Sequence, residues 1–367
     1  MNIFVVFSLW FLAAQAILTA AQLLLRKKQL KPAARVCIIL GKALLAIVFA
    51  VLVLAGPVQL RAVQPLMMAL YVALLADAAA DAVCSVICAI RKKERRFGAV
   101  KTVSLICGVL FFVFGVINMQ VVTPKTHTYT SDKLTAEHTV VFFADLHVGS
   151  AQPFRVTEQT IAQIKDLRPE ATILGGDIVD DYTTREEMEA TFRLFADFET
   201  PVYYLYGNHD RQGHAEYAGG KKFTQAELEA ALQANGVILL KDSFAKIAPD
   251  LLLLGREDVS EKEGRLPASA LVNPDPAAYL IVADHQPVQF KDNLAVGADL
   301  QLSGHTHAGQ LFPLGTFFRL FSYCYGDYTE GNAVMNVSAG ACGWRMPLRT
   351  QAGCHYEVIR LVPASAE

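Results

Sequence analysis

Residues 139–147 read TVVFFADLH, a short run of β-branched and aromatic residues that ends in Asp145 and His147. A run of this kind and length favours a buried β-strand. The carboxylate and the imidazole come just after the strand, and in α/β sheets the carboxyl ends of the strands form the edge where sites are built. The stretch therefore predicts a strand that delivers two polar side chains to a site.

Four more apolar runs along the chain end in polar motifs with the same placement. These motifs are Gly175-Gly176-Asp177-Ile178-Val179-Asp180, Gly207-Asn208-His209-Asp210, Asp284-His285 and Ser303-Gly304-His305-Thr306-His307. Any one of them could be a pair of surface residues, but five in succession, each after a predicted strand, indicate a common site. Two divalent ions about 3.5–4 Å apart need a bridging carboxylate and several nitrogen and oxygen ligands, and this set supplies them.

Short apolar runs alternate with amphipathic stretches from Thr139 onward, a pattern typical of β/α units. The predicted strands are 139–144, 171–174, 202–205, 251–254, 279–282, 299–302, 334–337 and 356–361. The predicted helices are 154–167, 185–198 and 224–234. This part of the chain is therefore predicted to have an α/β fold.

The order of the motifs resembles that of the calcineurin-like metallophosphoesterase superfamily: DLH, GD-x-x-D, GNHD, a single His and then GHTH. The resemblance covers residues 140–361. The sequence GHTHAGQ at 304–310 is similar to the GHTHxGQ motif of a membrane-associated branch of that superfamily. The resemblance implies an α/β fold in which a calcineurin-like β-sandwich is flanked by helices.

The resemblance also implies the ligands of two divalent metal ions. Those of the first ion are Asp145, His147 and His307; those of the second are Asn208, His285 and His305; and Asp177 bridges both. Mixed ligation by His, Asp and Asn accepts manganese, iron, zinc or cobalt. The sequence therefore leaves the identity of the metals open.

In such a site, a hydroxide between the two ions attacks phosphorus, because the cations lower the pKa of bound water and neutralise the charge that develops. His209 directly follows the expected ligand Asn208 and is free to protonate the leaving oxygen as a general acid. Asp180, the second carboxylate of GD-x-x-D, is expected to orient His209 and hold its proton.

Many relatives in the superfamily carry an Arg that helps to clamp phosphate directly after the second Asp of GD-x-x-D. Here that position is Asp181. Four basic residues are candidates to bind the substrate phosphate instead: Arg211, His214, Arg345 and Arg349. The alternative is that they are ordinary surface residues. Three histidines match no motif and are expected to be structural or solvent-facing: His127, His138 and His355.

The first 122 residues differ in composition from the rest. Hydrophobic residues make up 53% of the whole chain, and the excess lies in this part. Four apolar stretches approach or reach the length that crosses a hydrocarbon core about 30 Å thick; they are 3–25, 36–55, 66–90 and 100–122. The first lacks a basic segment and a clean cleavage site, so we expect it to be retained. We expect a four-helix transmembrane domain at 1–122, a linker at 123–138 and a metallophosphoesterase domain at 139–367.

The charges of the loops predict the orientation of these spans. The loop after the first span carries Arg26, Lys27, Lys28, Lys31 and Arg35, and the loop after the third carries Arg91, Lys92, Lys93, Arg95 and Arg96. The loop after the second span offers only Arg61. Because basic loops remain in the cytoplasm, we expect a multi-pass protein of the cell membrane whose catalytic domain is extracytoplasmic.

Asp77 and Asp81 lie four residues apart, on one face of the third predicted span. Carboxylates inside a membrane are costly and point to a function by default. One interpretation is that they face the interior of the helix bundle, protonated or paired with Lys42. The other is that they recognise a lipid headgroup or an ion.

The expected function is that of a membrane-anchored phosphoesterase that hydrolyses phosphoester or pyrophosphate bonds of a lipid-linked or envelope substrate. Tethering would raise the effective concentration of the site at the bilayer, so membrane lipids and a phosphorylated substrate are the expected partners. A formal net charge of −2 gives no argument for a nucleic-acid partner. The alternatives are a catalytically silent metal-binding sensor or scaffold and a transporter with an accessory hydrolase. The full ligand set and the presence of His209 favour the enzyme.

Overall fold

A computed structural model describes residues 3–26, 30–54, 63–94 and 96–364. The chain divides into two compact units, Met1–Ile117 and Asn118–Glu367. The expected linker at 123–138 is corrected by the structure, since most of it is strand β1 (Val122–Ser131). β1 pairs in parallel with β12 (Cys354–Pro363) and so completes the edge of a sheet. Its partner strand comes from the other end of the chain, which is why the local sequence gave no signal for it.

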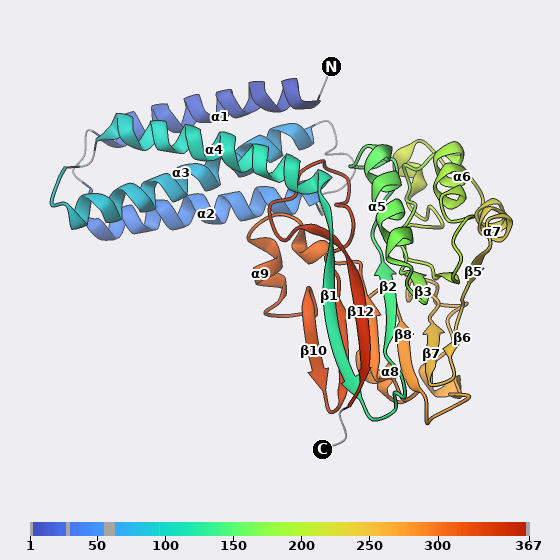
Figure 1. Cartoon of the computed structure of the whole chain (residues 1–367). Coiled ribbons are helices and arrows are strands. Elements are labelled where there is room, and N and C mark those ends of the chain that lie inside the picture. Colours follow the sequence, from blue (N-terminus) through green and yellow to red (C-terminus); the bar gives the residue numbers. More distant parts are fainter. Residues whose placement is uncertain (1–2, 27–29, 55–62, 95, 365–367) are drawn as a thin grey trace. The chain divides into compact units, whose positions relative to one another are not determined.

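Four long apolar helices form the first unit, and each is long and apolar enough to cross a membrane (Figure 1). They are α1 (Ile3–Arg26), α2 (Pro32–Leu54), α3 (Gln64–Ile90) and α4 (Phe97–Gln120). The last residues of α4 belong to the second unit. Some residues used for the predicted spans and their orientation lie outside the described part of the chain: Lys27, Lys28, Ala55, Arg61 and Arg95.

The two carboxylates of α3 are buried and paired with lysines of neighbouring helices. The ammonium group of Lys42 on α2 lies 2.6 Å from Oδ2 of Asp77 and 2.6 Å from Oδ2 of Asp81. Lys101 on α4 lies 2.5 Å from Oδ1 of Asp77, and Gln22 on α1 donates to Oδ2 of the same residue at 2.9 Å. Asp77 therefore joins all four helices. Buried charges are tolerated when they are paired in this way, and the expected pairing with Lys42 is confirmed.

Two six-stranded sheets form the second unit (Figure 1). The strand order of the first sheet is β1-β12-β2-β3-β4-β5, and that of the second is β10-β11-β9-β8-β7-β6. The remaining strands of the first sheet are β2 (His138–Phe143), β3 (Ala171–Leu174), β4 (Val202–Tyr204) and β5 (Val237–Leu239). Those of the second are β6 (Ser243–Ala248), β7 (Leu251–Gly255), β8 (Tyr279–Ala283), β9 (Leu300–Ser303), β10 (Gly326–Glu330) and β11 (Ala333–Val337).

Alternation of side chains along the strands builds the layers. On β2, Val140 and Phe142 pack into the core between the two sheets, whereas Val141 and Phe143 pack against helices. Those helices are α5 (Phe154–Leu167), α6 (Arg185–Arg193) and α7 (Gln225–Ala234). Successive residues of a strand point to opposite faces, so a strand that is apolar throughout must be covered on both. The predicted fold class, a β-sandwich flanked by helices and preceded by four apolar helices, is confirmed.

The central strands and helix α5 lie where the sequence predicts them. Among the described residues, the sequence missed the peripheral strands β1, β5, β6 and β10. The burial patterns of β1 and β10 mix exposed and half-buried residues, so their sequences lack the apolar runs of central strands. The shorter helices α8 (Phe290–Leu294) and α9 (Leu314–Phe318) lie in connections of the second sheet.

Candidate metal centre

Loops from both sheets meet at one place in the second unit. Three of the five motif loops follow the parallel strands β2, β3 and β4 of the first sheet, and two follow the parallel strands β8 and β9 of the second. They bring together two groups of side chains whose possible ligand atoms lie within 4.8 Å of one another: Asp145, His147 and His307, and Asp177, His285 and His305. All are buried except His305, which is half-buried. The expected ligands therefore converge as the motif order suggested.

Asp177 lies between the two groups. Its Oδ2 atom is 3.1 Å from Nε2 of His285 and 3.7 Å from Nε2 of His147. His147 in turn faces His307, with 3.2 Å between their Nε2 atoms. One carboxylate thus contacts a member of each group, which is the placement that a bridging ligand requires.

Hydrogen bonds fix which nitrogen faces the centre in two of the four imidazoles. Nδ1 of His285 lies 2.8 Å from the carbonyl oxygen of Gly175, and Nδ1 of His307 lies 3.0 Å from that of Cys342. A carbonyl only accepts, so these nitrogens carry the proton and leave Nε2 with a lone pair. Metal-binding histidines in proteins are commonly oriented by such a bond from the second nitrogen.

The donor set fits divalent metal ions. The Oδ1 atom of Asn208 is buried and has no hydrogen-bond partner among the described residues, which is costly unless another group accepts its lone pairs. Burial and the neighbouring His285 lower the pKa of His305 to about 4, so its ring is neutral near pH 7 and can donate a lone pair. Carboxylate, amide and imidazole donors together suit first-row divalent ions.

The backbone adopts left-handed conformations at the residues that carry these donors. Positive φ angles between 44° and 70° occur at Asp145, His147, Asp177, His305 and His307. Non-glycine residues rarely adopt this conformation, and where they do it usually reflects a functional constraint. Neighbouring glycines allow the loops to approach closely. A Cβ atom at Gly207 would collide with Oδ1 of Asp177, and one at Gly304 would collide with Oδ2 of Asp145.

Asp210 connects two of the motif loops, a role that sequence reasoning did not assign. Its carboxylate accepts from the backbone N–H groups of Asp177 at 2.8 Å, Gly207 at 2.6 Å and Val179 at 3.1 Å. These bonds hold the loop after β3 against the loop after β4. Asp210 is the last residue of the GNHD motif, so the sequence did mark it. A buried carboxylate needs several hydrogen-bond donors, and this requirement could have suggested its role.

The structure corrects the expected partner of His209. Nδ1 of His209 lies 2.8 Å from Oδ2 of Asp181, not from Asp180. Asp180 instead accepts from the backbone N–H groups of Tyr182 and Thr183, and its Oδ2 atom is 3.3 Å from Nδ1 of His147. The turn at 180–183 directs Asp180 toward the first ligand group and Asp181 toward His209. The motif alone could not reveal that Asp181, and not Asp180, contacts His209.

The surroundings of His209 favour its protonated form. Burial opposes the charge, but the carboxylates of Asp177 and Asp181 raise the pKa of His209 to about 9. The ring centroid of His209 lies 5.6 Å from that of His147, 5.2 Å from that of Trp344 and 5.8 Å from that of His214. His209 thus lies between the first ligand group and aromatic rings that partly exclude water.

Of the expected phosphate-binding residues, Arg211 and Arg349 make contacts with other groups of the chain. Arg211 makes two hydrogen bonds to Glu257, at 3.0 and 2.8 Å, and its guanidinium lies 3.5 Å from the ring centroid of Tyr206. Arg349 is fully buried and donates to three carbonyl oxygens, those of Cys342, His307 and Ala339. It is therefore shielded from solvent and supports the loop that carries His307.

His214 lies next to His209, and Arg345 lies next to Trp344, whose ring is 5.2 Å from that of His209. The backbone N–H of His214 donates to Oδ1 of Asp181 at 2.8 Å, and the ring of His214 lies against that of His209. The guanidinium of Arg345 lies 4.8 Å from the ring centroid of Trp344. Burial lowers the pKa of Arg345, and the charge of Asp181 opposes this shift. The loop between β11 and β12 thus brings a cation, Arg345, close enough to interact with the charge of Asp181.

The three histidines outside the motifs contact carboxylates of the fold and are structural, as expected. His127 and His355 both contact Glu357, at 3.0 and 2.9 Å, and His138 lies 2.8 Å from Glu170. Hydrogen bonds to Asp327 and Glu357 raise the pKa of His127 to about 9. These contacts link β1, β10 and β12 at the sheet edge.

A β-sandwich with two neighbouring groups of buried ligands at the carboxyl ends of its strands defines a class of domain that can bind a pair of metal ions. The sequence model of the calcineurin-like phosphoesterase family matches residues 138–309. The second unit therefore contains a calcineurin-like phosphoesterase domain. That family of metallophosphoesterases implies divalent metal ions as cofactors.

Named relatives agree with this assignment. An uncharacterized metallophosphoesterase of Helicobacter pylori (strain J99) is 27% identical over 237 residues, which cover 63% of this chain and 62% of the relative. A transmembrane protein with metallophosphoesterase domain from Danio rerio is 25% identical over 229 residues, covering 57% and 50% of the two chains. The chain thus spans less than two thirds of the length of these relatives.

Among solved structures, a dimetal phosphatase from Danio rerio covers 55% of this chain and 88% of its own, with 11% identity and a TM-score of 0.35.

Proposed function

We propose that this protein is a dinuclear-metal phosphoesterase anchored in a membrane by its N-terminal helices. The observation that carries the proposal is the position of Asp177, whose carboxylate contacts histidines of both buried ligand groups. Asp145, His147 and His307 would hold one ion, and Asn208, His285 and His305 the other. The family relationship and the four apolar helices support the two parts of this proposal.

The ions, when bound, would supply an activated water and neutralise charge at phosphorus. The remaining chemistry belongs to the side chains of the chain. His209, protonated near neutral pH, would donate its proton to the leaving oxygen. Asp181 orients the ring of His209 through Nδ1 and favours the imidazolium form. His214 lies beside His209, and Arg345 lies beside Trp344, whose ring faces that of His209. These two residues would contact the phosphate oxygens.

Removal of divalent metal tests the proposal directly. The chain, purified in detergent, is expected to hydrolyse bis(p-nitrophenyl) phosphate, to lose this activity on chelation and to recover it when manganese, zinc, iron or cobalt is returned. Metal analysis is expected to find two ions per chain in the active preparation. Hydrolysis that persists without metal, or a fully loaded protein that turns over none of a panel of monoesters, diesters and pyrophosphates, would contradict the proposal.

We further propose that the substrate is linked to the membrane or the envelope and that the catalytic unit lies outside the cytoplasm. Support comes from the basic residues around the helices, including Arg91, Lys92 and Lys93 after α3. Basic loops remain cytoplasmic, which places the chain after α4 on the opposite side. The partners under this proposal are membrane lipids and a phosphorylated substrate; nothing in the charge favours nucleic acid.

Reporter fusions test this orientation. Alkaline phosphatase fused after Glu367 is expected to be active, because it folds only where disulfides form, whereas a fusion at Arg91 is expected to be inactive. The reverse pattern would place the catalytic unit in the cytoplasm. It would leave the metallophosphoesterase assignment unaffected.

A further inference from the structure

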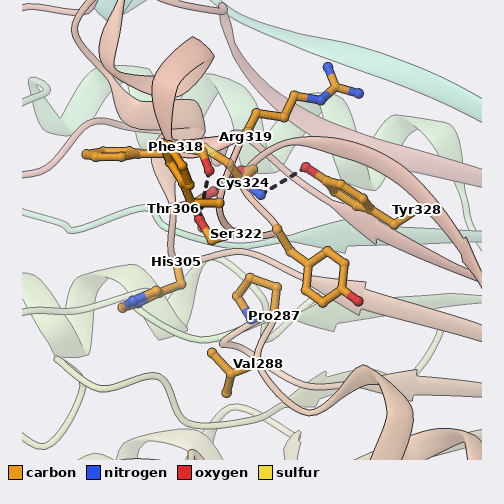
Figure 2. Close-up of a pocket in the computed structure, with 11 residues that line it drawn as sticks. Pro287, Val288, His305, Thr306, Phe318, Arg319, Ser322, Cys324 and Tyr328 are labelled. Atoms are coloured by element: carbon orange, nitrogen blue, oxygen red, sulfur yellow. Dashed lines mark hydrogen bonds between the residues drawn. The ribbon is translucent and has the colours of Figure 1, made fainter.

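A cavity of about 770 Å³ adjoins the second ligand group. Its walls come from the loop after β8, from the start of the loop after β9 and from residues 318–328. Figure 2 shows Pro287 and Val288 on one side of this space and Phe318 and Tyr328 on others. His305 is part of the wall, and its ring belongs to the group with Asp177 and His285. The cavity therefore shares one residue, His305, with the candidate metal centre.

The walls of the cavity are mainly carbon. Aromatic rings dominate one side, where Tyr323 and Tyr328 meet edge to face with 4.9 Å between their centroids. The hydroxyl of Tyr328 is occupied, since it accepts from the backbone N–H of Cys324 at 3.0 Å. Pockets of about 300–1,000 Å³ with mostly apolar walls and few polar groups are typical of small-molecule sites. Thr306, Arg319 and Ser322 add polar groups to the lining. The apolar part, which includes Pro287, Val288 and Phe321, suits a hydrocarbon group.

The segment that forms one wall also presents apolar side chains to solvent. Five large hydrophobic residues are exposed within 312–321: Phe312, Phe317, Phe318, Leu320 and Phe321. Phe321 is 87% exposed and Leu320 is 69% exposed. Contiguous exposed apolar surface on a folded unit marks a binding site more often than chance. Here the surface lies at the rim of a cavity that already adjoins the candidate metal centre.

His209 and the cavity lie beside different ligand groups. The ring of His209 contacts that of His147 in the first group, whereas the cavity adjoins His305 in the second. A phosphate held between the groups would direct its leaving oxygen toward His209. Its other ester group would then extend past His305 into the cavity.

We propose that this cavity binds the hydrocarbon part of an amphipathic phosphodiester, namely the ester group that stays on phosphorus when the leaving alcohol departs. The proposal rests on the proposed phosphoesterase function and names the class of its substrate. Each methylene group that enters the cavity should raise kcat/KM by roughly threefold to fourfold, the factor that corresponds to burying a CH₂ group.

A chain-length series tests this. The substrates are methyl, butyl and octyl p-nitrophenyl phosphate, which share one leaving group, assayed below their critical micelle concentrations with the full chain in nanodiscs. The ratio of kcat/KM for the octyl ester to that for the methyl ester is expected to be at least about 100 in the wild-type protein. Val288→Ser and Phe321→Ser, which both replace apolar lining residues, are each expected to lower this ratio about tenfold.

Leu320→Ser is the matched control. Leu320 lies next to Phe321 and is exposed, but it does not line the cavity, so its ratio is expected to equal that of the wild type. Partition of long esters into the bilayer affects all variants alike and cancels in this comparison. A wild-type ratio near one, equal ratios in all variants, or a loss with Leu320→Ser as large as with Phe321→Ser would overturn the proposal, the last result indicating contact with the bilayer instead. If none of the three esters is hydrolysed, the phosphoesterase function itself fails.

Discussion

Replacing Asp177 with Asn is expected to lower kcat/KM for phosphodiesters by about 10³-fold or more, which corresponds to roughly 4 kcal/mol of transition-state stabilisation. The carboxylate lies between the two ligand groups, 3.1 Å from His285 and 3.7 Å from His147. A neutral amide keeps the shape, but it removes one charge and one acceptor oxygen. It therefore cannot bridge two cations. Metal analysis of the Asp177→Asn protein is expected to give one ion per chain or fewer.

Asp327→Asn provides the matched control for this substitution. Asp327 lies on β10, where its carboxylate bonds to Asn336 and Tyr129, away from the motif loops. Its replacement makes the same chemical change and is expected to leave activity and metal content at wild-type values. If Asp177→Asn hydrolysed diesters as fast as the wild type, the dinuclear mechanism would be wrong. If the protein were a catalytically silent metal-binding sensor, the wild-type chain itself would bind two ions and hydrolyse no substrate.

The second large effect concerns the leaving group. His209→Asn is expected to lower kcat/KM by about 10²–10³-fold for esters with basic leaving groups, the range of a general-acid contribution. For p-nitrophenolate, which needs little protonation, the loss should be smaller than tenfold. Aryl methyl phosphates from p-nitrophenyl to p-methoxyphenyl provide a graded series. The variant should show a much steeper dependence on the basicity of the leaving group.

Asp181 and Asp180 can be separated by the same series. Because Asp181 contacts His209 at 2.8 Å, Asp181→Asn should steepen the dependence on the leaving group, though less than His209→Asn. The double variant should match His209→Asn alone, since Asp181 would then act only through His209. Asp180→Asn should lower kcat/KM by the same factor for all the esters, because Asp180 lies beside His147 and not beside His209. If Asp180→Asn gave the steeper dependence and Asp181→Asn did not, the roles would be reversed and the geometry misleading.

The sequence determined much of this protein because its strongest signals are local. Apolar runs at 171–174 and 279–282 predict central strands, which are buried on both faces and therefore apolar throughout. The polar motifs follow these strands directly, so their placement at the carboxyl edge needs no knowledge of the tertiary fold. The length and composition of the four N-terminal helices are likewise properties of single segments.

Tertiary structure alone decided what depends on contacts between distant segments. β1 is mostly exposed or half-buried on its own, and its pairing with β12 at the other end of the chain makes it a strand. Arg211 and Arg349 are polar residues near the site in sequence, yet Glu257 and backbone carbonyls bind them. Whether Asp180 or Asp181 faces His209 depends on one turn of the backbone, because adjacent side chains point in different directions. The motif therefore predicted that a carboxylate orients His209, and the tertiary structure determined that this carboxylate is Asp181.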